Sequence, residues 1–135
     1  MTHPTALQTW HRLVRERDVH GLQTLLAEDA VFHSPVVHTP QRGRKLAAAY
    51  LGAAFHVFFN ETFRYVREVV QDSNAVLEFE VEIDGIVVNG VDMITWNDQG
   101  QITDFKVMLR PLKAIHLIHQ KMAQMLEAMA PKAQP

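Results

Sequence analysis

One acidic residue stands among apolar neighbours in a stretch that is patterned as a β-strand. Asp92 shares a two-residue period with Ile94 and Trp96, so the three side chains should lie on one face of that strand. A carboxyl group buried with apolar residues is costly unless it is hydrogen-bonded, and burial raises its pKa. Two interpretations of Asp92 follow. It exchanges protons with a bound molecule, or it is a structural carboxyl satisfied by Trp10, an arginine or a backbone amide.

The other titratable candidates are histidines, and the sequence offers them few partners. His33 should point away from the face that carries Phe32 and Ser34, because successive residues of a strand face opposite sides. His116 and His119 are three residues apart in a helical pattern and could share a metal ion. No acidic residue lies at a spacing that would complete such a site. We therefore expect neither a metal nor a cofactor.

The elements that must hold Asp92 begin with a set of strands. From residue 61 to residue 110, apolar residues recur at every second position, which predicts four antiparallel strands. Asp84-Gly85 is a two-residue hairpin signal, and the polar residues from Asn97 to Gly100 form a second turn. Asp92 falls on the third of these strands, between the two turns.

Helices precede and follow these strands. Helical spacing predicts two short helices that meet at Arg17-Asp18, a third over about residues 45–58, and a last helix after Pro111. A short strand at residues 29–34 separates the second helix from the third. This order predicts an α+β fold in which helices pack into the concave side of a curved sheet.

Composition narrows the classes of function. The chain has 135 residues, 47% of them hydrophobic, which suits one domain, and we assign residues 1–130 to it and 131–135 to a frayed tail. A net charge of −2 without a basic block argues against nucleic acid as a partner. No run is long and apolar enough for a membrane span, and the start does not resemble a signal peptide. The absence of cysteine suits a reducing compartment, so we expect a cytoplasmic protein.

Four short segments carry a resemblance to a known superfamily. They are RDVHGL at residues 17–22, LAEDAVFHSP at 26–35, GRK at 43–45 and DQGQI at 98–102. In their order and spacing, the chain resembles the nuclear transport factor 2-like superfamily in its SnoaL-like branch, a superfamily that includes ketosteroid isomerases, polyketide cyclases and limonene epoxide hydrolases. The resemblance implies a cone: a strongly curved, mainly antiparallel sheet, helices on its concave face, a pocket open at one end, and frequent dimers through the outer sheet face.

The resemblance also implies where catalytic groups would stand. Ketosteroid isomerases use an aspartate before the proline of the first strand as the base, and a first-helix tyrosine and a late-strand aspartate as hydrogen-bond donors. These positions fall on Ser34, Trp10 and Asp92, so one of the three groups is kept. Serine is no base at neutral pH unless it is activated, and an indole only donates a hydrogen bond. The proton shuttle of a steroid isomerase is therefore not expected.

Together these observations predict a pocket for a small hydrophobic ligand. Beside Asp92 we expect it to be lined by Trp10, Phe32, Ser34, Leu51, Phe55, Phe79, Ile94, Phe105 and Val107. One hypothesis is an isomerase-, cyclase- or hydratase-type enzyme that uses Asp92 as its acid/base or oxyanion donor. The alternatives are a protein that binds the ligand without turnover, and a homodimeric interaction module that works through its outer sheet face.

Overall fold

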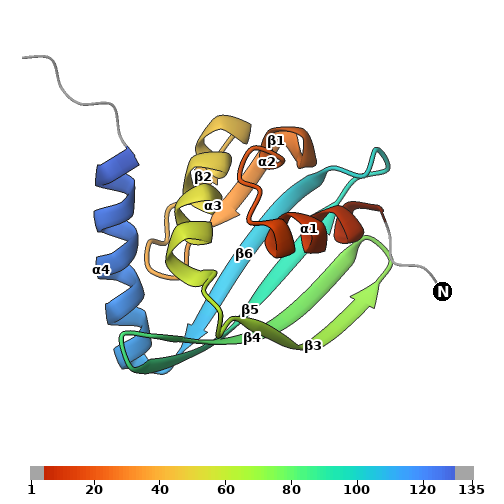
Figure 1. Cartoon of the computed structure of the whole chain (residues 1–135). Coiled ribbons are helices and arrows are strands. Elements are labelled where there is room, and N and C mark those ends of the chain that lie inside the picture. Colours follow the sequence, from red (N-terminus) through yellow and green to blue (C-terminus); the bar gives the residue numbers. More distant parts are fainter. Residues whose placement is uncertain (1–4, 130–135) are drawn as a thin grey trace, which may run out of the picture.

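A curved six-stranded sheet partly enwraps three helices, and a fourth helix stands beside the third (Figure 1). The computed structural model describes residues 5–129, so the predicted tail at 131–135 and both extremities of the predicted domain lie outside the described residues. The elements in chain order are α1 Thr5–Glu16, α2 Leu22–Leu25, β1 Leu26–His33, β2 Gln41–Arg42, α3 Arg44–Phe58, β3 Arg64–Gln71, β4 Asn74–Ile83, β5 Ile86–Trp96, β6 Ile102–Arg110 and α4 Leu112–Met129.

The sheet has the order β2-β1-β6-β5-β4-β3, and its neighbours are antiparallel except for the parallel pair of β1 and β6. The predicted α+β class, with a curved and mainly antiparallel sheet and a C-terminal helix, is confirmed. The tight turn between β4 and β5 is Asp84-Gly85, where φ is 51° and 78°. Positive φ at both central residues is what a type I′ two-residue hairpin turn requires, and this turn fixes the register that brings Asp92 opposite Leu77.

Each helix buries one apolar face. In α1 the buried residues are Ala6, Leu7, Trp10 and Leu13, at helical spacing. The small residues of α3, such as Ala48 and Ala53, are buried and let the helix lie close to its neighbours. The helix α4 packs beside α3 (Figure 1) and buries Ala114, Ile118 and Met122. No helix within residues 5–129 has both the length and the apolar character needed to cross a membrane.

The chain between α1 and β1 differs from the prediction. The expected second helix shrinks to α2, and β1 begins at Leu26 rather than at residue 29. The reason is local, because Asp18 Oδ1 accepts the N–H of Gly21 at 3.2 Å and ties the preceding residues into a turn. Leu26 itself pairs with Ile102 of β6. The two-residue strand β2, which pairs with Val31 and Phe32 of β1, was not among the predicted strands.

Candidate functional site

The concave face of the sheet encloses a cavity of about 30 Å³ beside Asp92. Its walls come from α1, α3, the segment after α3, and strands β4, β5 and β6; the lining residues are Trp10, Leu51, Ala54, Phe55, Phe58, Phe59, Phe63, Phe79, Asp92, Phe105 and Val107. Seven of these are aromatic, and Asp92 alone among these described lining residues has a titratable side chain. The cavity therefore has apolar walls and one side chain, Asp92, that can bind or release a proton.

Asp92 lies on the inward face of β5, between Leu77 of β4 and Val107 of β6. Its side chain is buried, and its Oδ2 accepts a hydrogen bond from the hydroxyl of Tyr65 at 2.6 Å. Burial raises the pKa of Asp92 from its ordinary 3.8 to about 7, while the hydrogen bond from Tyr65 opposes this rise because it favours the charged form. A carboxyl with this pKa is present in both protonation states near neutral pH.

Tyr65, on β3, connects Asp92 to the first helix. The Nε1–H of Trp10 donates to the Tyr65 hydroxyl oxygen at 3.0 Å, and that hydroxyl donates in turn to Asp92. Burial, followed by the nearby charge of Asp92, raises the pKa of Tyr65 well above its ordinary 10.0. Tyr65 thus keeps its proton at neutral pH, and the three side chains form a one-way series of donors ending at the carboxyl group.

The second oxygen of Asp92, Oδ1, takes no part in the hydrogen bond from Tyr65. Within residues 5–129, no fully buried side-chain nitrogen or oxygen lacks a hydrogen-bond partner. Asp92 Oδ1 makes no hydrogen bond to any described residue, so it is not fully enclosed by protein. Because Asp92 lines the cavity, Oδ1 is the atom that a molecule in the cavity would meet.

Most of the residues predicted to line a pocket are at this cavity, but Phe32 and Ile94 are not. Phe32 is buried behind it, with its ring 6.2 Å from that of Phe105 and 5.9 Å from that of Tyr50. Ile94 shares the inward face of β5 with Asp92 but lies one pleat further along the strand, where it is buried opposite Phe105. Both residues pack the core that supports the cavity.

Ser34, at the position of the base in the isomerases, also lies away from the cavity. The strand β1 ends at His33, and the chain then turns at Pro35, where Ser34 Oγ accepts the N–H of Val36 at 3.1 Å. Ser34 lines a separate surface groove together with His33. The concave face therefore receives no proton acceptor from this position.

The histidines do not join Asp92. His33 Nε2 lies 2.9 Å from Asp104 Oδ1, outside the cavity. His116 and His119 are exposed on α4. Within the described part of the chain, no three His, Cys, Asp or Glu side chains are grouped so that they could hold a metal ion.

Sequence reasoning missed five residues around the cavity: Ala54, Phe58, Phe59, Phe63 and the hydrogen-bond donor Tyr65. A signal was present, because five of the chain's nine phenylalanines and tyrosines fall between residues 55 and 65. Such a concentration of rings where a helix passes into a strand is a compositional indication of an aromatic site.

Comparison with known proteins assigns the family. The SnoaL-like domain model matches residues 7–105, and the chain belongs to this family within the nuclear transport factor 2-like superfamily. No curated protein gives a significant match.

Solved structures agree with this assignment. A steroid delta-isomerase from Pseudomonas aeruginosa is 35% identical, with a TM-score of 0.86, over 93% of this chain and 94% of its own. An uncharacterized bacterial protein with a cystatin-like fold from Silicibacter pomeroyi is 35% identical, with a TM-score of 0.82, over 91% and 85% of the two chains. A protein from Jannaschia, provisionally assigned as a SnoaL-like polyketide cyclase, is 15% identical with a TM-score of 0.66 over 85% and 94%, and shows the fold alone.

Proposed function

We propose that the chain binds a small apolar molecule in the aromatic cavity and that Asp92 exchanges a proton with it, in an isomerase-, cyclase- or hydratase-type reaction. The observation that carries this proposal is Asp92 itself, the one titratable side chain among the described lining residues, with Oδ1 not hydrogen-bonded to them and a pKa of about 7. A carboxyl group with that pKa can both take and return a proton at neutral pH. Similarity to a steroid delta-isomerase favours rearrangement of a double bond next to a carbonyl group.

The arrangement of donors limits this chemistry. Proton removal beside a carbonyl needs a base for the carbon and a donor for the developing oxyanion. The Trp10 N–H and the Tyr65 O–H are already committed within the protein, and Ser34 lies outside the cavity. Asp92 is therefore a base when ionised or a donor when neutral, but not both at once. This single-group site favours a second candidate function, a ligand-binding protein without turnover.

Conversion of cyclohex-3-en-1-one to its conjugated isomer, followed by ultraviolet absorbance, tests the catalytic proposal. We expect the rate constant to rise with pH through about 7, because the ionised form of Asp92 is the base. Asp92→Asn keeps the size of the side chain and should abolish turnover while the ketone still binds. Equal rates in the variant and the wild type would refute the role of Asp92, and wild-type binding without turnover would select the second candidate.

We also propose that two copies associate through the outer sheet face. An apolar stripe crosses this face where Val69 lies opposite Val76, Val76 opposite Met93, and Val91 opposite Met108. Met108, on the inner strand β6, is 50% exposed, and Val69, on the edge strand β3, is 56% exposed. Exposed apolar side chains that gather on one face indicate an interaction site.

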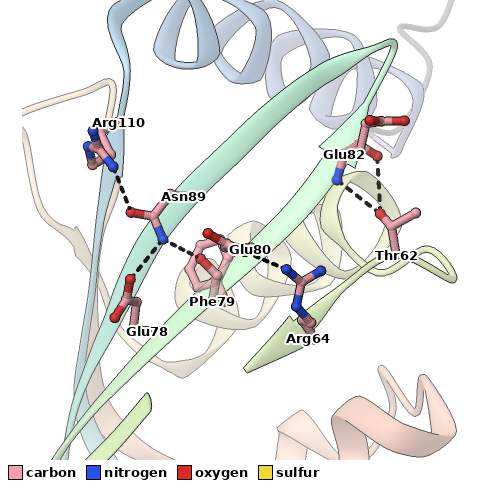
Figure 2. Close-up of polar contacts among 8 residues, drawn as sticks. All are labelled: Thr62, Arg64, Glu78, Phe79, Glu80, Glu82, Asn89 and Arg110. Carbon is pink, nitrogen blue, oxygen red and sulfur yellow. Dashed lines mark hydrogen bonds and ion pairs between the residues drawn. The ribbon is translucent and has the colours of Figure 1, made fainter. Parts of the chain in front are cut away.

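Polar groups flank this apolar stripe on the same face. Asn89 donates to Glu78 and to the carbonyl of Phe79 and accepts from Arg110, while Arg64 pairs with Glu80 (Figure 2). An apolar centre with a polar rim is the usual composition of a protein interface. We expect sedimentation to give a dimer that Met108→Glu dissociates, and a monomeric wild type would contradict this.

The cytoplasmic location expected from the sequence stays a prediction.

A further inference from the structure

The cavity is smaller than the molecules that its lining favours. Its volume is about 30 Å³, whereas one water needs about 10–15 Å³ and a cavity that binds benzene measures about 150 Å³. With every lining side chain in place, the site thus holds about two waters and no ring. Entry of a ligand to this cavity is part of the proposed function, on which the gate described next depends.

Two of the lining rings stand where they can move. Trp10, Phe79 and Phe105 are buried and belong to a helix or to strands inside the sheet. Phe59 and Phe63 are partly exposed, and both lie on the segment of residues 59–63, which joins α3 to β3 without helix or strand structure. Apart from Ala54 of α3, the partly exposed lining residues all lie on this segment, so we place the mouth of the cavity here.

Phe59 and Phe63 contact each other and the walls of the cavity. The ring centroids of Phe59 and Phe63 are 4.7 Å apart, in an edge-to-face arrangement. Phe59 also meets Phe55 at 4.7 Å, and Phe63 stacks on Phe79 at 5.3 Å. Together Phe59 and Phe63 cover the mouth of the cavity, and each of them packs against a buried ring, Phe55 and Phe79 respectively.

A small set of hydrogen bonds holds the segment closed. Thr62 Oγ1 accepts the backbone N–H of Glu82 at 2.9 Å, which Figure 2 shows at the end of β4. Asn60 Nδ2 donates to the Glu82 carbonyl oxygen at 2.9 Å, and Asn60 Oδ1 accepts the N–H of Thr62 at 2.7 Å. These bonds are exposed, so water can replace them when the segment swings out.

We propose that Phe59 and Phe63 form a gate that sets the size of the ligand and its rate of entry, held shut by the attachment of Thr62 to Glu82. The ligand is a flat molecule of one or two rings that displaces these side chains and presents one hydroxyl or carbonyl oxygen to Asp92 Oδ1. The four-ring size suggested by the steroid isomerase relative is not required by this site.

Stopped-flow binding of 2-naphthol, detected by its own fluorescence, tests the gate. In the wild type the observed rate should level off with concentration, because gate opening limits entry. Phe63→Ala removes one of the two rings that cover the mouth and leaves a ring-sized opening. We therefore expect the observed rate to rise linearly with the concentration of 2-naphthol and association to be at least about 10-fold faster.

Thr62→Val is the milder variant, since it keeps the side-chain shape and removes only the hydroxyl. In the closed state the Thr62 hydroxyl accepts the Glu82 N–H and donates to Asn60 Oδ1 or to the Glu82 carbonyl oxygen. Its loss weakens the closed state alone, so association should accelerate at least about fivefold, the effect of losing one ordinary hydrogen bond, with the dissociation rate unchanged and Kd lowered by the same factor. Thr95→Val is the matched control, because its hydroxyl bonds Asn74 at the opposite end of β4. It should bind 2-naphthol as the wild type does.

Two outcomes would overturn the inference, and they differ. If wild type, Phe63→Ala and Thr62→Val all bind 2-naphthol at rates within twofold of one another, there is no gate, although the proposed ligand site stands. If neither 2-naphthol nor phenol binds any variant, including the opened Phe63→Ala, the proposed function fails and the gate fails with it. Should Phe63→Ala not fold, Thr62→Val decides the first outcome.

Discussion

Replacing Asp92 by asparagine should make the protein more stable at alkaline pH. The carboxyl group is buried among aromatic rings, and its pKa in the folded chain is about 7, against an ordinary 3.8. Folding therefore favours the neutral form. The asparagine side chain would have almost the same size and could still accept the Tyr65 hydroxyl, but it would carry no charge at any pH. The variant thus isolates the cost of ionising this group inside the fold.

The sign and size follow from proton linkage. Because the folded pKa is raised, the stabilising contribution of Asp92 is complete below pH 3.8 and is lost as pH rises through about 7. Each unit of pKa difference corresponds to about 1.36 kcal/mol, so the full loss is about 4 kcal/mol. Between pH 5 and pH 8, the free energy of unfolding of the variant should rise relative to that of the wild type by about 2–3 kcal/mol.

Urea unfolding of both proteins at several pH values between 5 and 8 measures this difference. Asp98→Asn is the matched control, because it makes the same substitution at an exposed carboxylate in the turn before β6. Its difference from the wild type should stay nearly constant with pH. If the free energy of unfolding of Asp92→Asn, relative to that of the wild type, stayed constant or fell as pH rises, folding would not favour the neutral form of Asp92, and the prediction would be refuted.

Three further predictions concern the surroundings of the site. Tyr65→Phe removes the hydrogen bond that favours the ionised carboxylate, so the pKa of Asp92 should rise above about 7 in a carboxyl-carbon NMR titration; an unchanged or lower value contradicts the contact. Gly90→Ala should lower the free energy of unfolding by about 1–3 kcal/mol in thermal denaturation, because its Cβ would lie 2.6 Å from the Met108 carbonyl oxygen and 2.7 Å from the ring of Phe79; equal stability would show that the sheet yields there. Arg64→Ala should cost less than about 1 kcal/mol by the same measurement, since its ion pair with Glu80 is exposed, and a larger loss would mean that the pair is coupled to its neighbours.

The fold followed from local patterns that the structure retains. Alternation along β4 and β5, with a hairpin at Asp84-Gly85, set the register of the central strands and placed Asp92 on the inward face. Helical spacing located α1 and α3 to within a residue or two. These patterns predicted the elements correctly because each element buries one face, and a buried face appears in the sequence as a regular spacing of apolar residues. The parallel pairing of β1 with β6 has no local signature, and it was not predicted from the sequence.

Tyr65 shows why the site was harder to predict than the fold. An unbroken two-residue period along β3 puts Tyr65 and Arg67 on the same face. The structure has a register shift between them, so that Tyr65 lies opposite the inward Phe79 while Arg67 lies opposite the outward Glu78. A bulge of this kind re-aims one side chain without changing the composition of the strand. Ser34 was misplaced for a related reason, because the chain leaves the sheet at Pro35 and the alternation ends there.

The parallel pairing of β1 with β6 also has a consequence for biosynthesis. The strand β1 lies between β2 and β6, so its longer partner is the last strand to be made. The indole of Trp10, from the first helix, likewise rests on the ring of Phe105 at 4.8 Å. While the chain is still on the ribosome, β1 can pack on α3 but lacks its longer strand partner, and Trp10 lacks the ring of Phe105. The cavity, which Phe105 and Val107 help to line, is therefore complete only after β6 has emerged.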